Sequence, residues 1–455
     1  MSTYSILVVD DELLTLNNLK KILEKEDYEV HQADCGEKAL EIIERDKPHL
    51  VLLDLMLPGI SGIEVLKRIK KMERETIVIM MTAYEILEKA VEAMKLGAYD
   101  YLLKPFKIND LKNIVRRALE TLSLRIRIMD HLQYEKGRYY LGKIVAESRK
   151  MKEVVEMAKR VAAADKTTVL LQGESGTGKE LLAKAIHYHS PRADKPIVDI
   201  NCAAIPENLM ESELFGYEAG AFTDAKKRKT GLLEKGDEGT VFFDEIGDMS
   251  LNLQAKILRV LEEGTFTRLG GDKQLKVNIR VIAATNKDLA RATEEGRFRS
   301  DLFYRLNVVP VFIPPLRERK EDILPLALSF IQEFNHELKR SYKGISQEAA
   351  QALMNYPWPG NARELKNIIE RMMSLCSAEE ILFTHLPLEI RDYQKLSGER
   401  TVEELIPRDS FMTLAELERK YIERILESTN NNKTKTAKIL GIHPTSLFRK
   451  IKSWN

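Results

Sequence analysis

Four short apolar runs in the first quarter of the chain end in polar groups: Asp10 and Asp11 follow SILVV, Asp54 follows HLVLL, Thr82 follows TIVIMM, and Lys104 follows YDYLL. Three carboxylates that gather at one place repel one another unless a hard cation lies among them, and Mg²⁺ prefers oxygen ligands of this kind. The hydroxyl of Thr82 suits a phosphate oxygen, and the amine of Lys104 supplies a fixed positive charge. Together these residue types predict a site that binds Mg²⁺ and accepts a phosphoryl group.

The apolar runs and the segments between them predict the fold that would bring these groups together. The runs at 5–9, 49–53, 76–81 and 99–103 indicate buried parallel strands, the weaker 28–32 indicates a fifth, and the segments 12–25, 36–46, 61–72, 85–96 and 108–120 have helical spacing. Strands that alternate with helices are typical of a doubly wound parallel sheet, here of the flavodoxin-like kind. Such sheets bind ligands beyond the carboxyl ends of their strands, where the polar groups stand.

This first segment, placed at 1–120, resembles the receiver domain of two-component response regulators. The resemblance implies that a partner histidine kinase phosphorylates Asp54. It also implies two sets of residues: a Mg²⁺ site made of Asp10, Asp11, Asp54 and the main-chain carbonyl of Met56, and a switch made of Thr82, Tyr101 and Lys104. Lys104-Pro105 matches the family's Lys-Pro pair, in which a cis bond is usual.

A helical linker is predicted at 121–140. Its apolar residues begin inside the preceding helix and follow steps of four and three residues: Leu111, Val115, Ala118, Leu122, Ile126, Met129 and Leu132. This spacing resembles a heptad repeat with one stutter. Two interpretations stay open, namely a helix that continues into a short dimerising coiled coil and an amphipathic helix that lies on its own domain.

A second chemical site begins at TTVLLQGESGTGKE (167–180), which combines an apolar strand, a glycine-rich turn and a helix start. The glycines let backbone N–H groups face phosphate oxygens, and the helix N-terminus adds a favourable field. Lys179 would reach the β- and γ-phosphates of a nucleotide. The next position carries Glu180 where common phosphate loops have Ser or Thr for Mg²⁺.

Later segments supply groups for nucleotide hydrolysis. TVFFDEIGD indicates a buried strand that ends in Asp244 and Glu245, which suit Mg²⁺ binding and polarisation of the attacking water. VIAATN ends in Asn286, placed to sense the γ-phosphate or the water. FRSDLFYRLN contains Arg299 and Arg305, which could act across a subunit boundary on the charge of the transition state.

Residues 141–388 look like the AAA+ domain of the NtrC family of bacterial enhancer-binding proteins, which activate sigma-54 RNA polymerase. The motifs GESGTGKE, ESELFGYEAGAFTDA, GTVFFDEIGDM, PPLRER and WPGNARELKN carry this resemblance. It implies a P-loop ATPase with a helical lid that works as a hexameric or heptameric ring and binds ATP between subunits.

The same resemblance implies a role for each matching residue. The phosphate loop comprises Gly173, Glu174, Ser175, Gly176, Thr177, Gly178, Lys179 and Glu180. The hydrolytic set comprises Asp244 and Glu245, Asn201 as a switch paired with Glu245, Asn286 as first sensor, Arg363 in the lid as second sensor, and Arg299 and Arg305 as arginine fingers.

A six-residue stretch between the two ATP motifs has no evident part in nucleotide binding. It consists of Gly220, Ala221, Phe222, Thr223, Asp224 and Ala225, a small loop with one aromatic residue at its tip. The resemblance implies that Phe222 and Thr223 contact sigma-54. The family's loop reads GAFTGA, so Asp224 replaces a glycine, adds a negative charge and reaches left-handed backbone angles less easily.

After a linker at 389–410, the segment 411–455 is typical of a small DNA-binding unit. LAELERKYIERILES suits a helix that either forms a dimer or packs within its own domain, and KTKTAKILGIHPTSLFRKIK reads as helix, tight turn at Gly441, and helix. Six Lys or Arg residues and no acidic residue lie between 428 and the end. The pattern is similar to the Fis-like helix-turn-helix of the same family and predicts binding to enhancer DNA.

The second helix of this unit is expected to divide its residues between two faces. Leu447, Phe448 and Ile451 are predicted to be buried. The residues predicted to face a major groove are Thr445, Ser446, Arg449 and Lys450.

Length and composition limit the class of protein further. A chain of 455 residues suggests about three domains, and a net charge of +1 excludes a uniformly basic surface that coats nucleic acid. Three widely spaced cysteines have no metal-ligand spacing and are typical of free thiols. The acidic start of the chain is unlike a signal peptide, and no apolar run approaches the ~18 residues of a membrane span. We therefore expect a cytoplasmic protein without a membrane segment.

Together these features predict a phosphorylation-controlled activator that binds enhancer DNA and uses ATP hydrolysis to remodel sigma-54 RNA polymerase. Phosphorylation would either promote ring assembly or release an inactive dimer, and the sequence leaves both open. The alternative is a phosphorylation-controlled DNA-binding repressor or sigma-54-independent regulator, which the departure at Asp224 favours.

Overall fold

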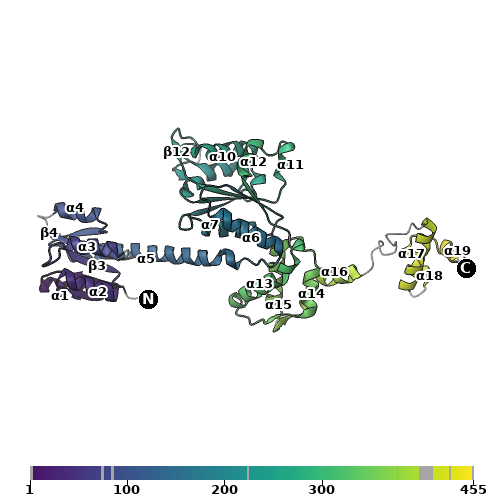
Figure 1. The fold of residues 1–455 in the computed structure, drawn as a ribbon, viewed down its shortest axis with the longest axis horizontal. Coiled ribbons are helices and arrows are strands. Elements are labelled where there is room, and N and C mark those ends of the chain that lie inside the picture. The colour runs from purple at the N-terminus through teal and green to yellow at the C-terminus, as the bar shows by residue number, and fades with distance from the viewer. Residues whose placement is uncertain are drawn as a thin grey trace. The chain divides into compact units, whose positions relative to one another are not determined.

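The computed structural model describes residues 4–72, 76–83, 87–222, 225–376, 378–398, 413–429 and 432–452 (Figure 1). The chain divides into two compact units, Met1–Arg138 and Tyr139–Asn455, and each is described by itself.

The first unit is a five-stranded parallel sheet with helices on both faces. Its strands are β1 (Ser5–Val9), β2 (Glu29–Ala33), β3 (Leu50–Asp54), β4 (Ile77–Ala83) and β5 (Asp100–Lys104), in the order β2-β1-β3-β4-β5. Its helices are α1 (Leu13–Glu24), α2 (Gly36–Asp46), α3 (Gly62–Lys71), α4 (Leu87–Lys95) and α5 (Ile108–Arg138). One apolar core lies between the sheet and α1 with α5, and the other lies beneath α2 and α3. The predicted flavodoxin-like fold is confirmed.

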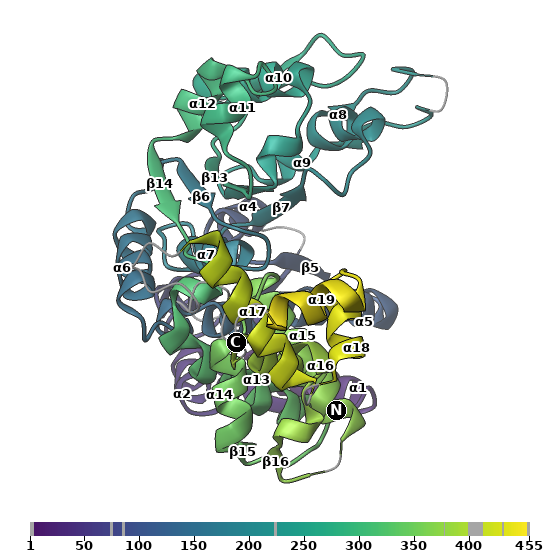
Figure 2. The ribbon, with the colours of Figure 1, turned by 90° about the vertical axis from the view of Figure 1, so that its right-hand side faces the viewer.

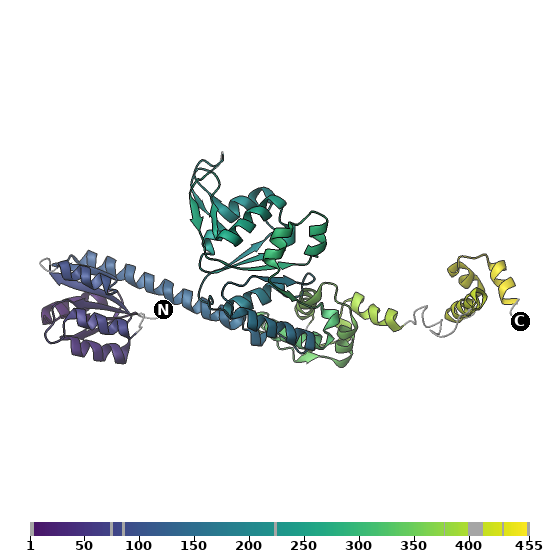
Figure 3. The same ribbon diagram turned by 45° about the horizontal axis from the view of Figure 1, so that its top comes forward.

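Helix α5 continues without interruption through the boundary predicted at residue 120 (Figure 3). The residues of the predicted apolar stripe are buried from Leu111 to Leu122, and Ile126 still packs partly against the core. Beyond that point Ile128 is 58% exposed and Met129 is 52% exposed. The first part of the stripe therefore packs on its own domain, and dimerisation through the remainder stays a prediction.

The second unit contains another five-stranded parallel sheet, between two layers of helices (Figure 2). The strands are β6 (Val169–Gln172), β7 (Ile197–Asn201), β10 (Thr240–Asp244), β13 (Arg280–Thr285) and β14 (Val309–Phe312), in the order β14-β6-β13-β10-β7. One face is covered by α6 (Arg149–Ala162) and α7 (Lys179–Tyr188). The other face is covered by α8 (Glu207–Phe215), α9 (Leu232–Lys235), α10 (Leu251–Glu263), α11 (Leu289–Glu294) and α12 (Ser300–Leu306).

Two short antiparallel strand pairs and several single 3-10 turns lie in the connections of this sheet. The pairs are β8 (Gly216–Tyr217) with β9 (Lys229–Thr230) and β11 (Thr265–Thr267) with β12 (Gln274–Lys276). The 3-10 turns are η2 (Leu141–Lys143), η3 (Ile246–Asp248), η4 (Leu316–Glu318) and η5 (Lys320–Asp322). The β8–β9 pair forms the base of the 220–225 segment.

A helical lid follows the sheet. It contains α13 (Ile323–Glu337), α14 (Gln347–Asn355), α15 (Asn361–Leu375) and α16 (Leu388–Gly398), with the parallel pair β15 (Gly344–Ile345) and β16 (Glu380–Ile381) and the turn η6 (Phe383–His385). Its core surrounds Trp358, which is fully buried and donates its ring N–H to the Leu353 carbonyl at 2.8 Å. This core fixes the start of α15.

The last three helices form a small domain with its own core. They are α17 (Leu414–Ser428), α18 (Lys433–Ile439) and α19 (Pro444–Lys452), and they bury Ile422, Leu426, Ala437 and Leu447 together. Asn432 caps α18, and Gly441 adopts a φ of 65° in the turn, as a helix-turn-helix requires. The helix at α17 therefore packs within its own domain. The predicted burial of Phe448 is wrong, because this ring is 56% exposed.

In the described ranges, no helix combines the length and the apolarity that a membrane span needs.

Candidate functional site

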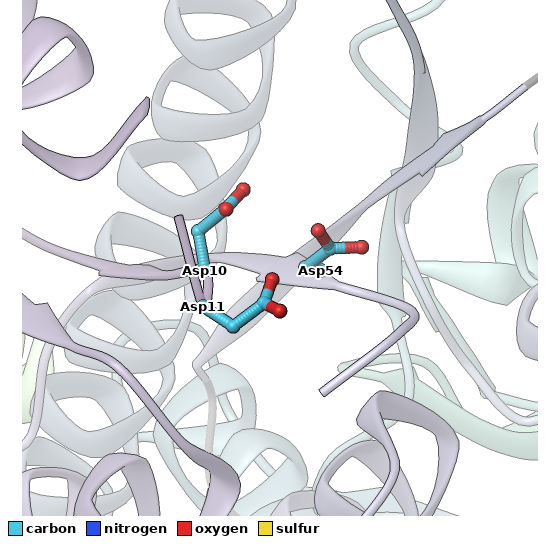
Figure 4. Close-up of side chains that lie close together, drawn as sticks. All are labelled: Asp10, Asp11 and Asp54. Carbon is cyan, nitrogen blue, oxygen red and sulfur yellow. The ribbon is translucent and has the colours of Figure 1, made fainter. Parts of the chain in front are cut away.

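The carboxyl ends of β1 and β3 bring the three predicted carboxylates together (Figure 4). Oxygen atoms of Asp10, Asp11 and Asp54 all lie within 4.8 Å of one another. Asp10 and Asp54 are buried, whereas Asp11 is exposed. Lys104, at the end of β5, donates from Nζ to Asp10 Oδ2 at 2.5 Å and also pairs with Asp54 Oδ2. Strand register thus brings the three carboxylates and the amine together at one edge of the sheet.

The ionisation of this cluster explains why it suits a cation. Burial raises the pKa of the Asp10 carboxyl, and hydrogen bonds from Lys104 and from the Glu12 N–H offset only part of that rise. Burial lowers the pKa of Lys104, but its bonds to Asp10 and Asp54 outweigh burial and leave it raised. Burial still disfavours the ionised form of the Asp10 carboxyl, and a nearby divalent cation would stabilise that form. The oxygen-rich donor set therefore fits Mg²⁺.

The remaining predicted receiver residues lie around this cluster. Met56 follows β3, and its N–H donates to Asp54 Oδ1 at 3.1 Å. Thr82 on β4 is buried, Tyr101 on β5 is 37% exposed, and a cis peptide bond joins Lys104 to Pro105. Their roles as ligand and switch stay predictions.

The phosphate loop connects β6 to α7 with the expected backbone. Gly176 and Gly178 have φ values of 76° and 104°, in the region that favours glycine. Lys179 begins α7, is only 6% exposed, and donates from Nζ to the carbonyl oxygens of Gly173 at 2.9 Å and Glu174 at 3.3 Å. These contacts hold the amine inside the loop, where a nucleotide phosphate would replace the carbonyl partners.

The two predicted hydrolytic carboxylates stand at the end of β10. Burial, followed by the charge of Glu245, raises the pKa of the Asp244 carboxyl. Glu245 has a φ of 51°, and its Oε2 accepts the backbone N–H of Asn286 at 3.1 Å. The other oxygen, Oε1, lies 3.7 Å from Lys179 Nζ. The structure thus brings Lys179, Asp244, Glu245 and Asn286 to one edge of the sheet.

Asn201 lies directly opposite Asp244 in the register of β7 with β10. Its side-chain oxygen accepts the N–H groups of Ala203 and Ala204, each at 3.0 Å. Within the described residues, Asn201 and Glu245 do not form the predicted pair, since the Glu245 carboxylate faces Asn286 and Lys179 instead. Its role as a nucleotide-dependent switch stays a prediction.

The three predicted arginines divide into two groups. Arg363 at the start of α15 donates to Ser175 Oγ at 3.1 Å, so the lid brings it to the phosphate loop. Arg299 pairs with Asp301 at 2.7 Å, and Arg305 donates to the Leu261 carbonyl at 2.7 Å. Neither of these two contacts the phosphate loop of its own chain among the described interactions.

A clamp on the phosphate loop was missed by the sequence analysis. Arg317 donates two hydrogen bonds to Glu174, at 2.8 and 2.6 Å. Asn361, which is fully buried, donates to Glu174 Oε2 at 3.2 Å and to the Ser175 carbonyl at 3.0 Å, while its Oδ1 accepts from the Leu316 N–H at 2.7 Å. The only sequence signal was that these residues belong to PPLRER and WPGNARELKN.

The clamp also depends on close backbone approach. A side chain at Gly176 would place its first carbon 2.3 Å from the carbonyl oxygen of Gly360, so only glycine fits there. Arg319 is 3% exposed and donates to the Thr177 carbonyl at 2.9 Å. The lid and the segment before it therefore hold the outer side of the phosphate loop through main-chain contacts as well as through charge.

The 220–225 segment lies on the β8–β9 pair. Gly220 has a φ of 87°, and its N–H donates to the Ala225 carbonyl at 2.8 Å, which closes a tight loop. Phe222 is 45% exposed and contacts Tyr217 edge-on, with ring centroids 4.8 Å apart. The predicted contact residue Thr223 and the departure at Asp224 lie outside the described residues.

The base of this loop is anchored by a buried cation. Arg268 is 7% exposed, donates to Glu218 Oε1 at 2.6 Å and also pairs with Glu234. The N–H of Leu269 donates to the Gly216 carbonyl at 3.0 Å. A loop with a fixed base and an exposed aromatic residue is suited to pushing against a partner.

The predicted DNA-facing residues of α19 differ in exposure. Thr445 and Arg449 are exposed, whereas Ser446 and Lys450 are half-buried. Lys450 Nζ donates to Glu418 Oε2 on α17 at 2.8 Å, so this charge also serves the packing of the domain.

Four family models match consecutive parts of the chain. They are the response regulator receiver domain at 6–116, the sigma-54 interaction domain at 144–312, the AAA+ ATPase lid domain at 317–402, and the bacterial regulatory protein, Fis family, at 413–454. Together they confirm the predicted order of a receiver, an AAA+ ATPase with a lid, and a Fis-like helix-turn-helix.

Similarity to whole proteins extends over nearly the full length. The chain is 43% identical to the regulatory protein AtoC of Escherichia coli (strain K12), covering 99% of this chain and 97% of that protein. It is 42% identical to the transcriptional regulatory protein ZraR of Klebsiella oxytoca, covering 98% of each. The crystal structure of NtrX from Brucella abortus in complex with ADP is similar over 99% of both chains, with 35% identity and a TM-score of 0.61. The chain therefore belongs to the NtrC family of sigma-54-dependent response regulators, and it is a transcriptional activator with an AAA+ ATPase domain and a phosphate-accepting receiver.

Proposed function

We propose that a histidine kinase phosphorylates Asp54 and thereby controls a ring of ATPase domains whose 220–225 loops act on sigma-54 polymerase at an enhancer. The position of the loop in the chain is the main support for this coupling. It is inserted between β7, which ends in Asn201, and β10, which ends in Asp244, and these two residues pair in the sheet. The loop is therefore joined to both strands that end at the proposed γ-phosphate edge, at 19 residues from Asn201 and 19 residues from Asp244.

In the receiver, the proposal assigns Asp54 as the phosphate acceptor. Asp10, Asp11, Asp54 and the Met56 carbonyl would hold Mg²⁺, which when bound would offset the negative charges of the acceptor and the incoming phosphate. Lys104 now pairs with Asp10 and Asp54. A phosphoryl group on Asp54 would compete for this amine, and Thr82 would offer its hydroxyl to a phosphate oxygen.

In the ATPase domain, the proposal assigns residues 173–180 to the phosphates of ATP. Lys179 would exchange its carbonyl partners for the β- and γ-phosphates, and Asp244 would hold Mg²⁺. Glu245 would orient the attacking water, since its carboxylate is already positioned by the Asn286 N–H at 3.1 Å. The crystal structures of NtrX in complex with ADP and with ATP, at 35% and 36% identity, support nucleotide binding by this chain.

The exposed arginines on and beside α12 support a ring. The side chain of Arg299 is 42% exposed, and its guanidinium pairs with the neighbouring Asp301. Arg305 lies on α12 itself, whereas Arg299 directly precedes this helix. An arginine that acts on the transition state of hydrolysis must reach the γ-phosphate, so we assign both to the site of an adjacent subunit in a hexamer or heptamer. An inactive dimer would precede this ring. Enhancer DNA and sigma-54 polymerase are cytoplasmic in bacteria, so the protein would act in the cytoplasm.

The test is transcription from a sigma-54 promoter with purified components and supercoiled template. We expect ATP-dependent open complexes from the native protein, and an equal or higher yield from Asp224→Gly. If neither protein yields open complexes, activation of sigma-54 polymerase is refuted. If only the glycine variant does, the chain acts as a repressor or a sigma-54-independent regulator.

Control by phosphorylation needs its own variant. An Asp54→Asn protein should assemble and hydrolyse ATP at its basal rate whether or not a small-molecule phosphodonor is present, while the native protein responds. Indistinguishable behaviour of the two proteins under phosphodonor would sink the receiver's part of the proposal.

A further inference from the structure

The outward face of α19 contains the aromatic side chain of Phe448, which the sequence pattern predicted to be buried. Thr445, Phe448 and Arg449 are three and four residues apart, so they share one side of the helix. All three are exposed, and Phe448 is 56% exposed. The opposite side carries the fully buried Leu447. Phe448 therefore lies within the surface predicted to face DNA.

A cation fixes the position of this ring. The Nζ atom of Lys433, at the start of α18, lies 4.4 Å from the centroid of the Phe448 ring. A cation over the face of an aromatic ring is attracted by its negative π-surface. The contact limits rotation of the ring and places a positive charge directly beside an apolar group.

The charges around the ring narrow the choice of partner. From residue 429 to the end of the chain there are six basic residues and no acidic residue. A second copy of the same surface would be repelled, whereas a polyanion is attracted. The partner must also offer an apolar group at the centre of the contact. Double-stranded DNA provides both the negative charge and the apolar group, because thymine presents its 5-methyl group in the major groove beside the phosphates.

We propose that Phe448 is a specificity-determining residue that packs against a thymine methyl group in the major groove, next to the base that Arg449 contacts. Lys433 holds the ring and binds the adjacent backbone phosphate. The inference rests on the proposed binding of enhancer DNA by this domain and adds a base preference to it.

The first experiment selects binding sites from a random DNA library with the full-length native protein and with Phe448→Ala. We expect the native protein to require thymine at one position of each half-site and the variant to accept other bases there. Affinity of the variant for the native site should fall roughly five- to tenfold, within the range of a single mismatched base pair. Phe448→Leu should keep the preference, because it keeps an apolar group.

The second experiment removes only the methyl group, by replacing that thymine with deoxyuridine. Native protein should lose about as much affinity as it does through Phe448→Ala, and the variant should lose nothing further, which shows that the two changes remove one contact. Lys433→Gln removes both the phosphate contact and the cation over the ring, so binding to all sequences should weaken and the thymine preference should become smaller than in the native protein without being lost. Ile439→Ala, which removes another exposed apolar side chain of the same domain, serves as the control for stability and should leave selection unchanged.

The outcomes separate two failures. If the native protein selects no sequence, DNA recognition by this domain fails and the present inference fails with it. If native protein selects a site, but Phe448→Ala selects the same site and deoxyuridine changes nothing, only the role of Phe448 is overturned.

Discussion

The molecule contains two phosphate-handling sites built on the same plan, and they differ in how they are completed. Each lies at the carboxyl edge of a five-stranded parallel sheet, and each combines a lysine with aspartates, which are buried at Asp10 and Asp54 and half-buried at Asp244. In the receiver, Lys104 pairs directly with the carboxylates of Asp10 and Asp54. In the ATPase domain, Lys179 is turned to main-chain carbonyls.

The difference lies in the source of the remaining contacts. Every group of the receiver site comes from strand ends of one sheet. The outer side of the phosphate loop is held instead by Arg317, Asn361 and Arg363, which lie beyond the sheet in the lid and the segment before it. The receiver site is therefore complete within one sheet, whereas the ATP site is completed by residues of the lid and of the segment before it.

The largest expected effect is a loss of ATP hydrolysis that leaves phosphorylation of the receiver unchanged. Glu245→Gln should lower kcat for ATP hydrolysis by about 10²- to 10⁴-fold, because an amide cannot accept or orient a proton of the attacking water as a carboxylate does. Phosphate release measures hydrolysis, and a fluorescent nucleotide measures binding, which should change little. Phosphorylation of Asp54 by a small-molecule donor should be unaffected. A parallel loss of Asp54 phosphorylation would show that the sites are not independent.

A smaller effect tests whether the lid completes the ATP site. Arg317→Ala should raise KM for ATP about fivefold with little change in kcat, since an exposed ion pair contributes on the order of 1 kcal/mol after solvent screening. Steady-state hydrolysis at varied ATP concentration measures both constants. Lys150→Ala is the matched control, because Lys150 pairs with the adjacent Glu318 at 2.6 Å and does not contact the loop. An unchanged KM in Arg317→Ala would show that this ion pair does not contribute to ATP binding.

The smallest expected effect concerns stability of the receiver without divalent cations. Because burial raises the pKa of Asp10, its carboxyl holds a proton more tightly in the folded state than in the unfolded state. Ionisation therefore costs stability once the pH rises through the unfolded and then the folded pKa. At pH 7, Asp10→Asn should stabilise the receiver by on the order of 1 kcal/mol, a typical single-site magnitude.

Hydrogen exchange of amides in β1 and β3 measures this stability within the full chain. The gain should vanish near pH 3, where the native carboxyl is protonated in both states. Added Mg²⁺ should protect the native protein and not Asp10→Asn. A native protein that is more stable than the variant at pH 7 without Mg²⁺ would mean that Lys104 outweighs burial.

Local patterns predicted what lies within one element or at its end. Alternation of apolar runs predicted both the receiver sheet and the positions of Asp10, Asp54 and Lys104, because a parallel sheet collects the carboxyl ends of its strands at one edge. The glycines of the phosphate loop predicted its left-handed turns at Gly176 and Gly178. Helical spacing predicted the buried stripe of α5 as far as Leu122.

Patterns failed where a contact joins distant segments or where a helix is too short to have one clear face. Arg317 lies 143 residues from Glu174, and Asn361 lies 187 residues from it. No periodicity relates such positions. Helix α19 has nine residues, so its apolar positions allowed Phe448 on either side.

The sequence by itself determined the chemical groups of this protein and the backbone turns that present them, since strand ends, glycine turns and helix caps are encoded by neighbouring residues. Only the tertiary structure decided which distant groups complete them. Packing of the lid around Trp358 brings Asn361 and Arg363 to the phosphate loop, and packing of α19 through Leu447 turns Phe448 outward. The physical reason is that burial of one apolar side chain orients every polar and aromatic neighbour on the same rigid element.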